Sequence, residues 1–193
     1  SRAVGIAADA YGFYQIDDAT KAYRKVSQRT WEAEFLCQRP SADGLVFGEF
    51  DPLVHAIQPR DVPRDLKIYR AIDWGLGVFV CLWIGQDAAG RTYLLDTYRA
   101  EYGTLKTHAE YILAHRYQRI AGTYCDPAGR SRNDQTGRSN IEEFRRWGIP
   151  CTSVTSPKLR NVQNGLALVR AALAPAAGPP TLRYLAGDGN RMF

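Results

Sequence analysis

KIYRAIDWG, residues 67–75, predicts a β-strand that ends in an acid. The hydrophobic side chains of Ile68 and Ile72 favour burial, yet Asp73 follows them directly and precedes a Trp-Gly pair. A buried carboxylate costs free energy unless it is paired with a cation or bound to a metal. The rest of the sequence must therefore supply a reason for Asp73.

Two more strand-like runs follow this first strand. They are GVFVCLWIGQD at 77–87 and RTYLLDTYRAE at 91–101, and a DAAG turn signal lies between them. The three runs are close enough in sequence to form antiparallel hairpins.

Helices and strands alternate after these three runs. The sequence predicts helices at 104–117, 139–148 and 161–174, and strands at 120–129, 150–156 and 181–190. Thr104 and Ser139 are suited to cap the first two helices, and an Asp-Pro dipeptide stops the strand at 120–129. The order βββαβαβαβ predicts an α/β fold, a mixed sheet flanked by helices, in which ligand sites lie at strand ends.

The first 60 residues have a different pattern. Short helices are predicted at 17–26 and 30–37, followed at 39–52 by a Pro- and Gly-rich linker with one short strand. We therefore expect a linker and helical segment at 1–60 and the sheet domain at 61–193.

Composition narrows the classes of protein and site. The 193 residues suit one globular domain with an appendage, and a net charge of +5 permits a polyanionic partner without demanding one. No apolar run approaches the roughly 20 residues of a membrane span, and no signal peptide opens the chain. The cysteines form no CxxC pair and there are three histidines, so no zinc site is predicted; the thiols are expected to be buried and reduced. They are Cys37, Cys81, Cys125 and Cys151.

Asp126 gives Asp73 a partner of like charge. It ends the fourth predicted strand, in TYCDPAG, 126 − 73 = 53 residues after Asp73. If the first and fourth strands are neighbours, both carboxylates lie at one edge of the sheet and repel each other. Mg²⁺ or Mn²⁺ would resolve this conflict, and two such ions about 4 Å apart would clamp a phosphate. The alternative is that Asp126 is only a turn or cap residue.

Several other polar residues are candidates for the same site. Asp96 on the third strand either assists or pairs with an arginine, and Lys158 either orients water or a phosphate or is a surface lysine. The loop GRSRNDQTGR suits sequence-tolerant, salt-sensitive DNA contact, although an ordinary solvated loop is the alternative. The candidate DNA-binding residues are Arg130, Arg132, Arg138, Lys158 and Arg160.

The order of elements resembles the ribonuclease H-like fold, and the residues resemble the nuclease part of the large terminase subunit of tailed bacteriophages. IDWG at 72–75 is similar to the first-strand motif of that family, and YCDPAGRSRNDQTGRSNIEEFRRWGI at 124–149 to its second motif. The segment 14–47 resembles the connection between motor ATPase and nuclease. The resemblance implies an endonuclease that cuts concatemeric double-stranded DNA with Mg²⁺ or Mn²⁺ held by Asp73 and Asp126.

The chain departs from the family pattern in two places. It contains no GxxxxGK[ST], the phosphate-binding motif of the terminase ATPase. The third acid of the family lies in a C-terminal helix, whereas Asp188, in a predicted turn, is the only acid after Glu143. We therefore expect a fragment of a longer polypeptide, truncated before the third ligand, with Asp188 as the auxiliary candidate.

The resemblance also implies partners and a location. The small terminase subunit and the portal protein would be partners in the whole motor, and the host bacterial cytoplasm would be the location of this phage or prophage protein. Two other functions remain open from the residues. One is a phosphotransferase of the actin and sugar-kinase type, because IDWG resembles its DxG phosphate loop. The other is a non-catalytic domain of the same fold that binds DNA or a packaging partner.

Overall fold

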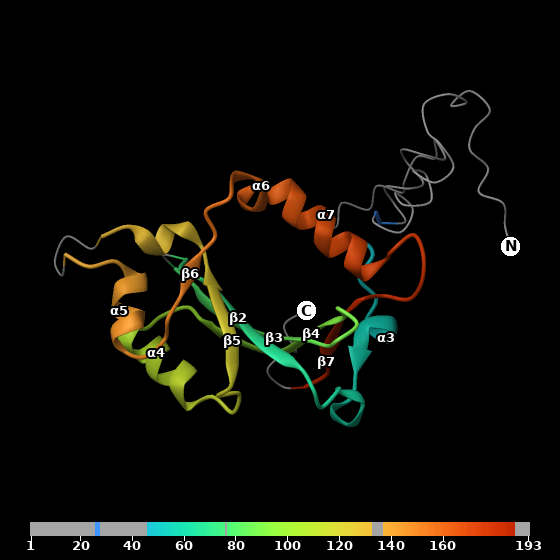
Figure 1. Ribbon diagram of the computed structural model, residues 1–193, viewed down its shortest axis with the longest axis horizontal. Helices are drawn as coiled ribbons and strands as arrows, with labels where there is room; N and C mark the ends of the chain where they lie inside the picture. Colours follow the sequence, from blue (N-terminus) through green and yellow to red (C-terminus); the bar gives the residue numbers. More distant parts are fainter. Residues whose placement is uncertain (1–25, 28–45, 76, 133–136, 188–193) are drawn as a thin grey trace, which may run out of the picture. The chain divides into compact units, whose positions relative to one another are not determined.

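The computed structural model describes residues 26–27, 46–75, 77–132 and 137–187, without the side chains of 158 and 159 (Figure 1). The helices are α3 (Pro52–His55), α4 (Leu105–Ala114), α5 (Asn140–Arg146), α6 (Pro157–Arg160) and α7 (Val162–Leu173), with 3-10 turns η2 (Pro59–Asp61) and η3 (Pro127–Arg130). The strands are β1 (Ala56–Ile57), β2 (Lys67–Asp73), β3 (Phe79–Gln86), β4 (Thr92–Ala100), β5 (Ile120–Cys125), β6 (Thr152–Ser153) and β7 (Leu182–Leu185).

The chain divides into two compact units. One comprises residues 1–55 and 161–182, and the other comprises 56–160 and 183–193. The expected boundary was near residue 60, with the helix at 161–174 in the sheet domain. Instead, hydrogen bonds tie α7 to the residues before the boundary: Nε2 of His55 lies 2.9 Å from the Leu173 carbonyl oxygen, and the Arg170 guanidinium donates to the Val46 carbonyl.

The second unit is built on a mixed sheet, as the sequence predicted. Its seven strands run in the order β1-β7-β4-β3-β2-β5-β6 (Figure 1). β2 and β4 flank β3 in antiparallel pairs. β5 lies between β2 and β6 and is parallel to both. The carboxyl ends of β2, β4, β5 and β6 therefore meet at one edge of the sheet, which we call the rim.

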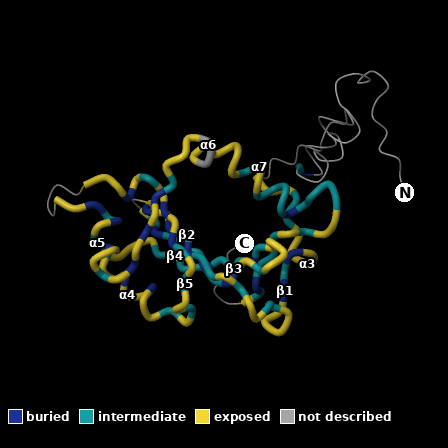
Figure 2. Tube along the Cα trace, in the orientation of Figure 1, coloured by how far each residue is buried: buried dark blue, intermediate teal, exposed yellow. Residues whose placement is uncertain are grey.

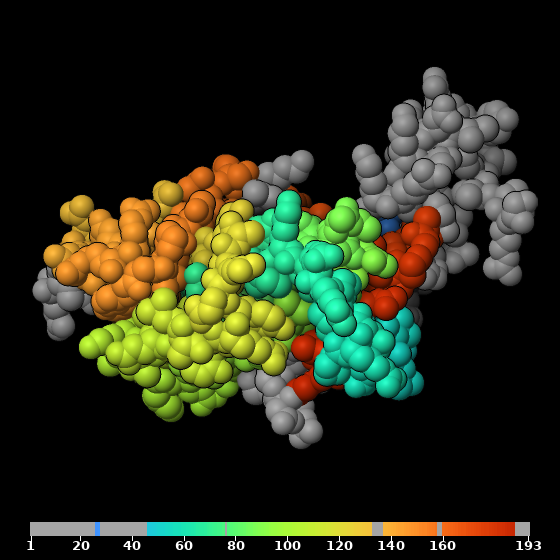
Figure 3. All heavy atoms as spheres, turned by 60° about the horizontal axis from the view of Figure 1, so that its bottom comes forward, coloured from blue at the N-terminus to red at the C-terminus, as the bar shows by residue number. Residues whose placement is uncertain are grey.

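Alternation along β3 decides which face of the sheet is the core. Phe79, Cys81 and Trp83 are buried, while the residues between them are only partly buried. Dark blue, buried stretches of the trace gather beside the labels of β2 and β4 in Figure 2. The ring of Phe79 stacks on His108 of α4, with ring centroids 4.3 Å apart. It also packs against Phe144 of α5, with ring centroids 6.2 Å apart. α4 and α5 therefore cover the same face, and they lie side by side in Figure 3, coloured yellow-green and orange.

The predicted caps of both helices are confirmed. The Thr104 side chain accepts a hydrogen bond from the Thr107 amide at the start of α4. Ser139 and Glu142 form a reciprocal capping box at α5, which satisfies two backbone donors. This box also fixes where the polar segment after Asp126 ends.

Residues 46–51 are turn or unpaired where a short strand was expected, and α3 and β1 follow them. The two helices expected at 17–26 and 30–37 lie almost wholly outside the described residues. Among the residues that the structure describes, no helix has the length and apolar composition needed to cross a bilayer.

Replacing Ser139 with Ala should lower the free energy of unfolding by about 1 kcal/mol, because the capping box loses its side-chain acceptor. Urea denaturation of the full chain would measure the change. Thr155→Ala, at an exposed position that caps no helix, is the control and should leave the free energy of unfolding within about 0.5 kcal/mol. Equal losses in both variants would contradict the role of the box.

Candidate active site

Asp73 and Asp126 lie next to each other at the rim. β2 and β5 are parallel neighbours, and Ile72 pairs with Cys125 in the last step of their register. The Asp126 amide donates to the Ile72 carbonyl over 3.1 Å, which continues the ladder to the residues that follow. Neighbouring strands are about 4.8 Å apart, so the two acids start from adjacent backbones. Both residues are exposed.

The carboxylate of Asp126 has two distinct oxygens. Oδ1 accepts a hydrogen bond of 2.6 Å from the Ala128 amide and caps η3, which is the turn role that the sequence left open. Oδ2 makes no hydrogen bond or ion pair with another described residue, and neither does the side chain of Asp73. The cap thus orients the Asp126 carboxylate and leaves one of its oxygens available.

Trp74 explains why the acid sits beside a large aromatic residue. Because side chains alternate along an extended chain, Asp73 points out of the core and Trp74 points into it. The Trp74 ring is 8% exposed and packs edge-on against Phe144 with centroids 4.7 Å apart. Stacking of this ring on a DNA base would require it to leave the core.

Two glycines allow the backbone to turn tightly around the rim. A Cβ atom on Gly75 would lie 2.4 Å from the Val78 carbonyl oxygen, in the turn from β2 to β3. A Cβ atom on Gly129, in η3, would lie 2.2 Å from Nε1 of Trp74. The backbone that follows Asp126 can therefore pack on the indole ring only because residue 129 has no side chain.

The donor set at the rim suits a hard divalent cation. Two exposed aspartates follow each other across adjacent strand ends, and carboxylate oxygens are ligands that Mg²⁺ and Mn²⁺ take. Among the described residues, however, no group of three His, Cys, Asp or Glu side chains is placed to hold a metal. Asp188, the expected auxiliary acid, lies outside the described residues.

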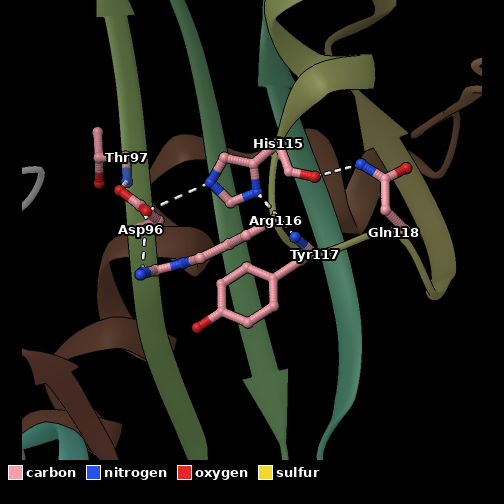
Figure 4. A network of polar contacts seen from close by, with 6 residues as sticks. All are labelled: Asp96, Thr97, His115, Arg116, Tyr117 and Gln118. Atoms are coloured by element: carbon pink, nitrogen blue, oxygen red, sulfur yellow. Dashed lines mark hydrogen bonds and ion pairs between the residues drawn. The ribbon is translucent and has the colours of Figure 1, made fainter.

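Asp96 is not at the rim. Asp96 pairs with Trp83 of β3, and Trp83 pairs with Arg70 of β2. Arg70 lies three residues before the end of β2, so Asp96 is set back from the rim. Its Oδ2 lies 3.1 Å from Nη2 of Arg116 and 3.3 Å from Nε2 of His115 (Figure 4). Of the two interpretations of Asp96, the pairing with an arginine is the one that this geometry shows.

The basic candidates follow the strands that end at the rim. Arg130, Arg132 and Arg138 are exposed in the segment between β5 and α5, and Arg138 pairs with Glu143 at 3.4 Å. Arg160 is exposed in α6, after β6. Lys158 is in the same short helix, and its side chain lies outside the described part of the chain.

The sequence analysis missed Arg99 as a member of this site. Arg99 pairs with Val80, which in turn pairs with Asp73, so the three residues form one row across β4, β3 and β2. Only the strand register shows this, because Arg99 lies 26 positions after Asp73 in the sequence (99 − 73). A hairpin alignment of the predicted strands was the one available signal.

A polar cluster lies on the buried face below the rim. Burial lowers the pKa of Arg70, whose Nε donates to Thr123 Oγ1 at 3.0 Å. Burial raises the pKa of Cys81 to about 12, whereas a hydrogen bond from Cys151 lowers the pKa of Cys125 to about 7. Cys81, Cys125 and Cys151 are buried free thiols, as the sequence predicted.

Solved structures share this architecture. The large terminase of a thermophilic bacteriophage has a TM-score of 0.65 and 18% identity, over 92% of this chain and 43% of that one. The P22 large terminase nuclease domain has a TM-score of 0.59 and 15% identity, over 74% of this chain and 73% of that domain. The fold is that of a large terminase nuclease domain. The ribonuclease H-like fold predicted from the sequence is thereby confirmed.

The chain spans less than half of the length of the thermophilic phage terminase. Neither a scan against models of protein families nor a search of curated proteins gives a match. Identities of 15% and 18% establish the fold, and the chemistry of the rim must be argued from its own residues.

Replacing Gly129 with Ala should destabilise the protein by about 1–3 kcal/mol, because the new methyl group would overlap the Trp74 indole. The measurement is the free energy of unfolding in urea. Gly77→Ala is the matched control, since a Cβ atom there would meet no described atom within 4 Å beyond its chain neighbours. A Gly129→Ala protein as stable as the control would show that η3 does not depend on this contact.

Lowering the pH should destabilise the fold below about pH 6.5, the ordinary pKa of histidine. Burial lowers the pKa of both His108 and His115, so the unfolded chain binds more protons than the folded one in this range. Stability present above the unfolded pKa is therefore lost as the pH falls through the folded values. Urea denaturation at several pH values would measure the slope, and His108→Gln should make it shallower; an unchanged slope would contradict this assignment.

Proposed function

We propose that this chain is the nuclease part of a phage large terminase and hydrolyses phosphodiester bonds in concatemeric double-stranded DNA. The observation that supports this proposal is the register of β2 with β5, because it brings the backbones of two exposed aspartates, Asp73 and Asp126, next to each other at the rim. Ligand sites of open α/β sheets lie at such strand ends.

Asp73 and Asp126 would hold Mg²⁺ or Mn²⁺, because two adjacent like charges favour a shared divalent cation. When bound, such ions activate water and stabilise the leaving oxygen of a phosphate. The hydrogen bond from Ala128 to Oδ1 fixes the Asp126 carboxylate and leaves Oδ2 for the ion. A third carboxylate, for which Asp188 is the candidate in this sequence, would complete the ligand set.

The exposed arginines after β5 would contact the DNA backbone. Arg130 and Arg132 follow Asp126 within six positions, so a phosphate held at the rim lies within reach of their segment. Arg138 and Arg160 would extend this contact, as would Lys158. In the whole motor, the small terminase subunit and the portal protein would be partners, in the cytoplasm of the host bacterium.

A non-catalytic DNA-binding domain is the second candidate. It is favoured by the finding that the described residues supply two acids at the rim and no set of three metal ligands. Cleavage by the unmodified chain separates the two candidates, because only a nuclease requires the acids for turnover.

Asp73→Asn and Asp126→Asn should each reduce cleavage of plasmid DNA in Mn²⁺ by about 100-fold or more, since each removes a charged ligand. Asn at 126 keeps an oxygen able to cap η3, so folding is preserved. Gel analysis of nicked and linear plasmid, with EDTA as a negative control, would measure the rate.

Asp61→Asn is the matched control for these variants. Asp61 is an exposed aspartate in η2, paired only loosely with Arg60 at 3.9 Å, and its substitution should leave cleavage unchanged. Cleavage that survives EDTA or both rim substitutions would refute the metal assignment. DNA binding without cleavage by the unmodified chain, even in Mn²⁺, would support the binding domain instead.

A further inference from the structure

The end of β4 presents an arginine, a glutamate and a tyrosine at the rim. These are Arg99, Glu101 and Tyr102, which we call the β4 rim segment. They belong to the same unit of the chain as Asp73 and Asp126. None of the three is needed to explain the metal site, so their arrangement raises a separate question.

The register fixes the face on which Arg99 lies. Residues paired across neighbouring strands point to the same side of a sheet, so Asp73, Val80 and Arg99 share one face. On the other side of β2, Asp126 follows Cys125, the last residue of β5, and its amide bonds to the Ile72 carbonyl. Two strand spacings separate Arg99 from Asp73, which is about 10 Å. At this backbone separation Arg99 does not pair directly with Asp73. Both side chains nevertheless lie on the same face of the sheet.

Glu101 forms an ion pair with the Arg99 guanidinium. Nη1 of Arg99 lies 2.7 Å from Oε1 of Glu101, and the two side chains are 37% and 55% exposed. An exposed ion pair of this kind contributes only about 0–1 kcal/mol, so a phosphate can replace the glutamate at little cost. The guanidinium has five N–H donors, and this pair uses one of them.

Tyr102 is 91% exposed and has no ring contact with another described residue. An aromatic side chain left in water beside a cation offers a flat surface for a sugar or a base. Tyr102 comes three residues after Arg99 in the chain, just past the end of β4 at Ala100.

We propose that Arg99 is a positioning residue that binds a backbone phosphate of DNA lying across the rim, while Tyr102 packs against the adjacent nucleotide. Glu101 holds Arg99 in the free protein and is displaced when the phosphate binds. A separation of about 10 Å means that this phosphate is a different one from the phosphate at the acids and lies near it along the duplex. This role rests on the proposed function for its reaction, although DNA binding can be tested without cleavage.

The test measures binding of a short fluorescent duplex DNA to the full chain in EDTA, over a series of salt concentrations. Arg99→Gln should weaken binding to every sequence alike and make the slope of log K against log salt shallower by about 1. Glu101→Gln should strengthen binding, because a negative charge beside the phosphate is removed. Both substitutions break the same ion pair, so a purely structural role predicts effects of the same sign.

The chain contains a matched control at the opposite edge of the sheet. Arg91 and Asp87, in the turn from β3 to β4, also pair at 2.7 Å. Arg91→Gln should leave the salt slope unchanged. Arg99→Lys should retain the slope, because lysine supplies the same charge, and Tyr102→Ala should weaken binding without changing the slope.

The proposal is overturned if Arg99→Gln and Glu101→Gln shift affinity in the same direction, or if Arg91→Gln lowers the slope as much as Arg99→Gln. Cleavage distinguishes this failure from failure of the nuclease assignment. If the unmodified chain cuts plasmid in Mn²⁺ and the slope is insensitive to Arg99, the nuclease assignment stands and the Arg99 contact is refuted. If the chain does not cut but Arg99→Gln changes the slope as expected, the phosphate contact stands without the catalysis. In a chain that cuts, Arg99→Gln should raise KM more than it lowers kcat.

Discussion

The parallel pairing of β2 with β5 is the constraint on which the rest of the structure depends. Its last contact, the hydrogen bond from the Asp126 amide to the Ile72 carbonyl, follows the pairing of Ile72 with Cys125, two residues 53 positions apart in sequence (125 − 72). A shift of one residue in this register would turn every side chain of β5 to the other face and separate the carboxylates. Burial of Ile72 and Cys125 on the core face opposes such a shift, so hydrophobic packing positions the polar rim.

The same alternation explains how an acid can end a core strand. Ile72 and Trp74 are buried on either side of Asp73, and Asp73 itself is exposed. The carboxylate therefore never incurs the desolvation cost that its neighbours in the sequence suggest. The close approach of Gly129 to the Trp74 ring then places the turn after Asp126 against the core, which couples the second acid to the first through packing.

Periodicity and caps were enough to predict the three antiparallel strands, the helices that start at Thr104 and Ser139, and the neighbouring strands that carry the two acids. The unit to which α7 belongs could not be predicted in this way. An amphipathic pattern indicates that one face of the helix is buried, but it does not indicate which unit buries that face. The pairing of Asp96 with His115 and Arg116 depends on how these side chains lie relative to one another in the folded chain, which the sequence pattern does not indicate. Arg99 was missed because strand register, which puts it in the row of Asp73, leaves no mark on local composition.

Charge at the rim is arranged so that acids and arginines do not neutralise each other. Asp73 and Asp126 stand without an arginine partner among the described residues, whereas Arg99 and Arg138 are each paired with a glutamate. Had either arginine paired with a rim aspartate, its positive charge would have offset the negative charge that attracts a divalent cation. The exposed Glu101 holds Arg99 weakly, so the Arg99 guanidinium remains available to a polyanion that brings its own negative charge. In the proposed arrangement, the metal site at Asp73 and the phosphate site at Arg99 would be about two strand widths apart, a separation that the strand register sets.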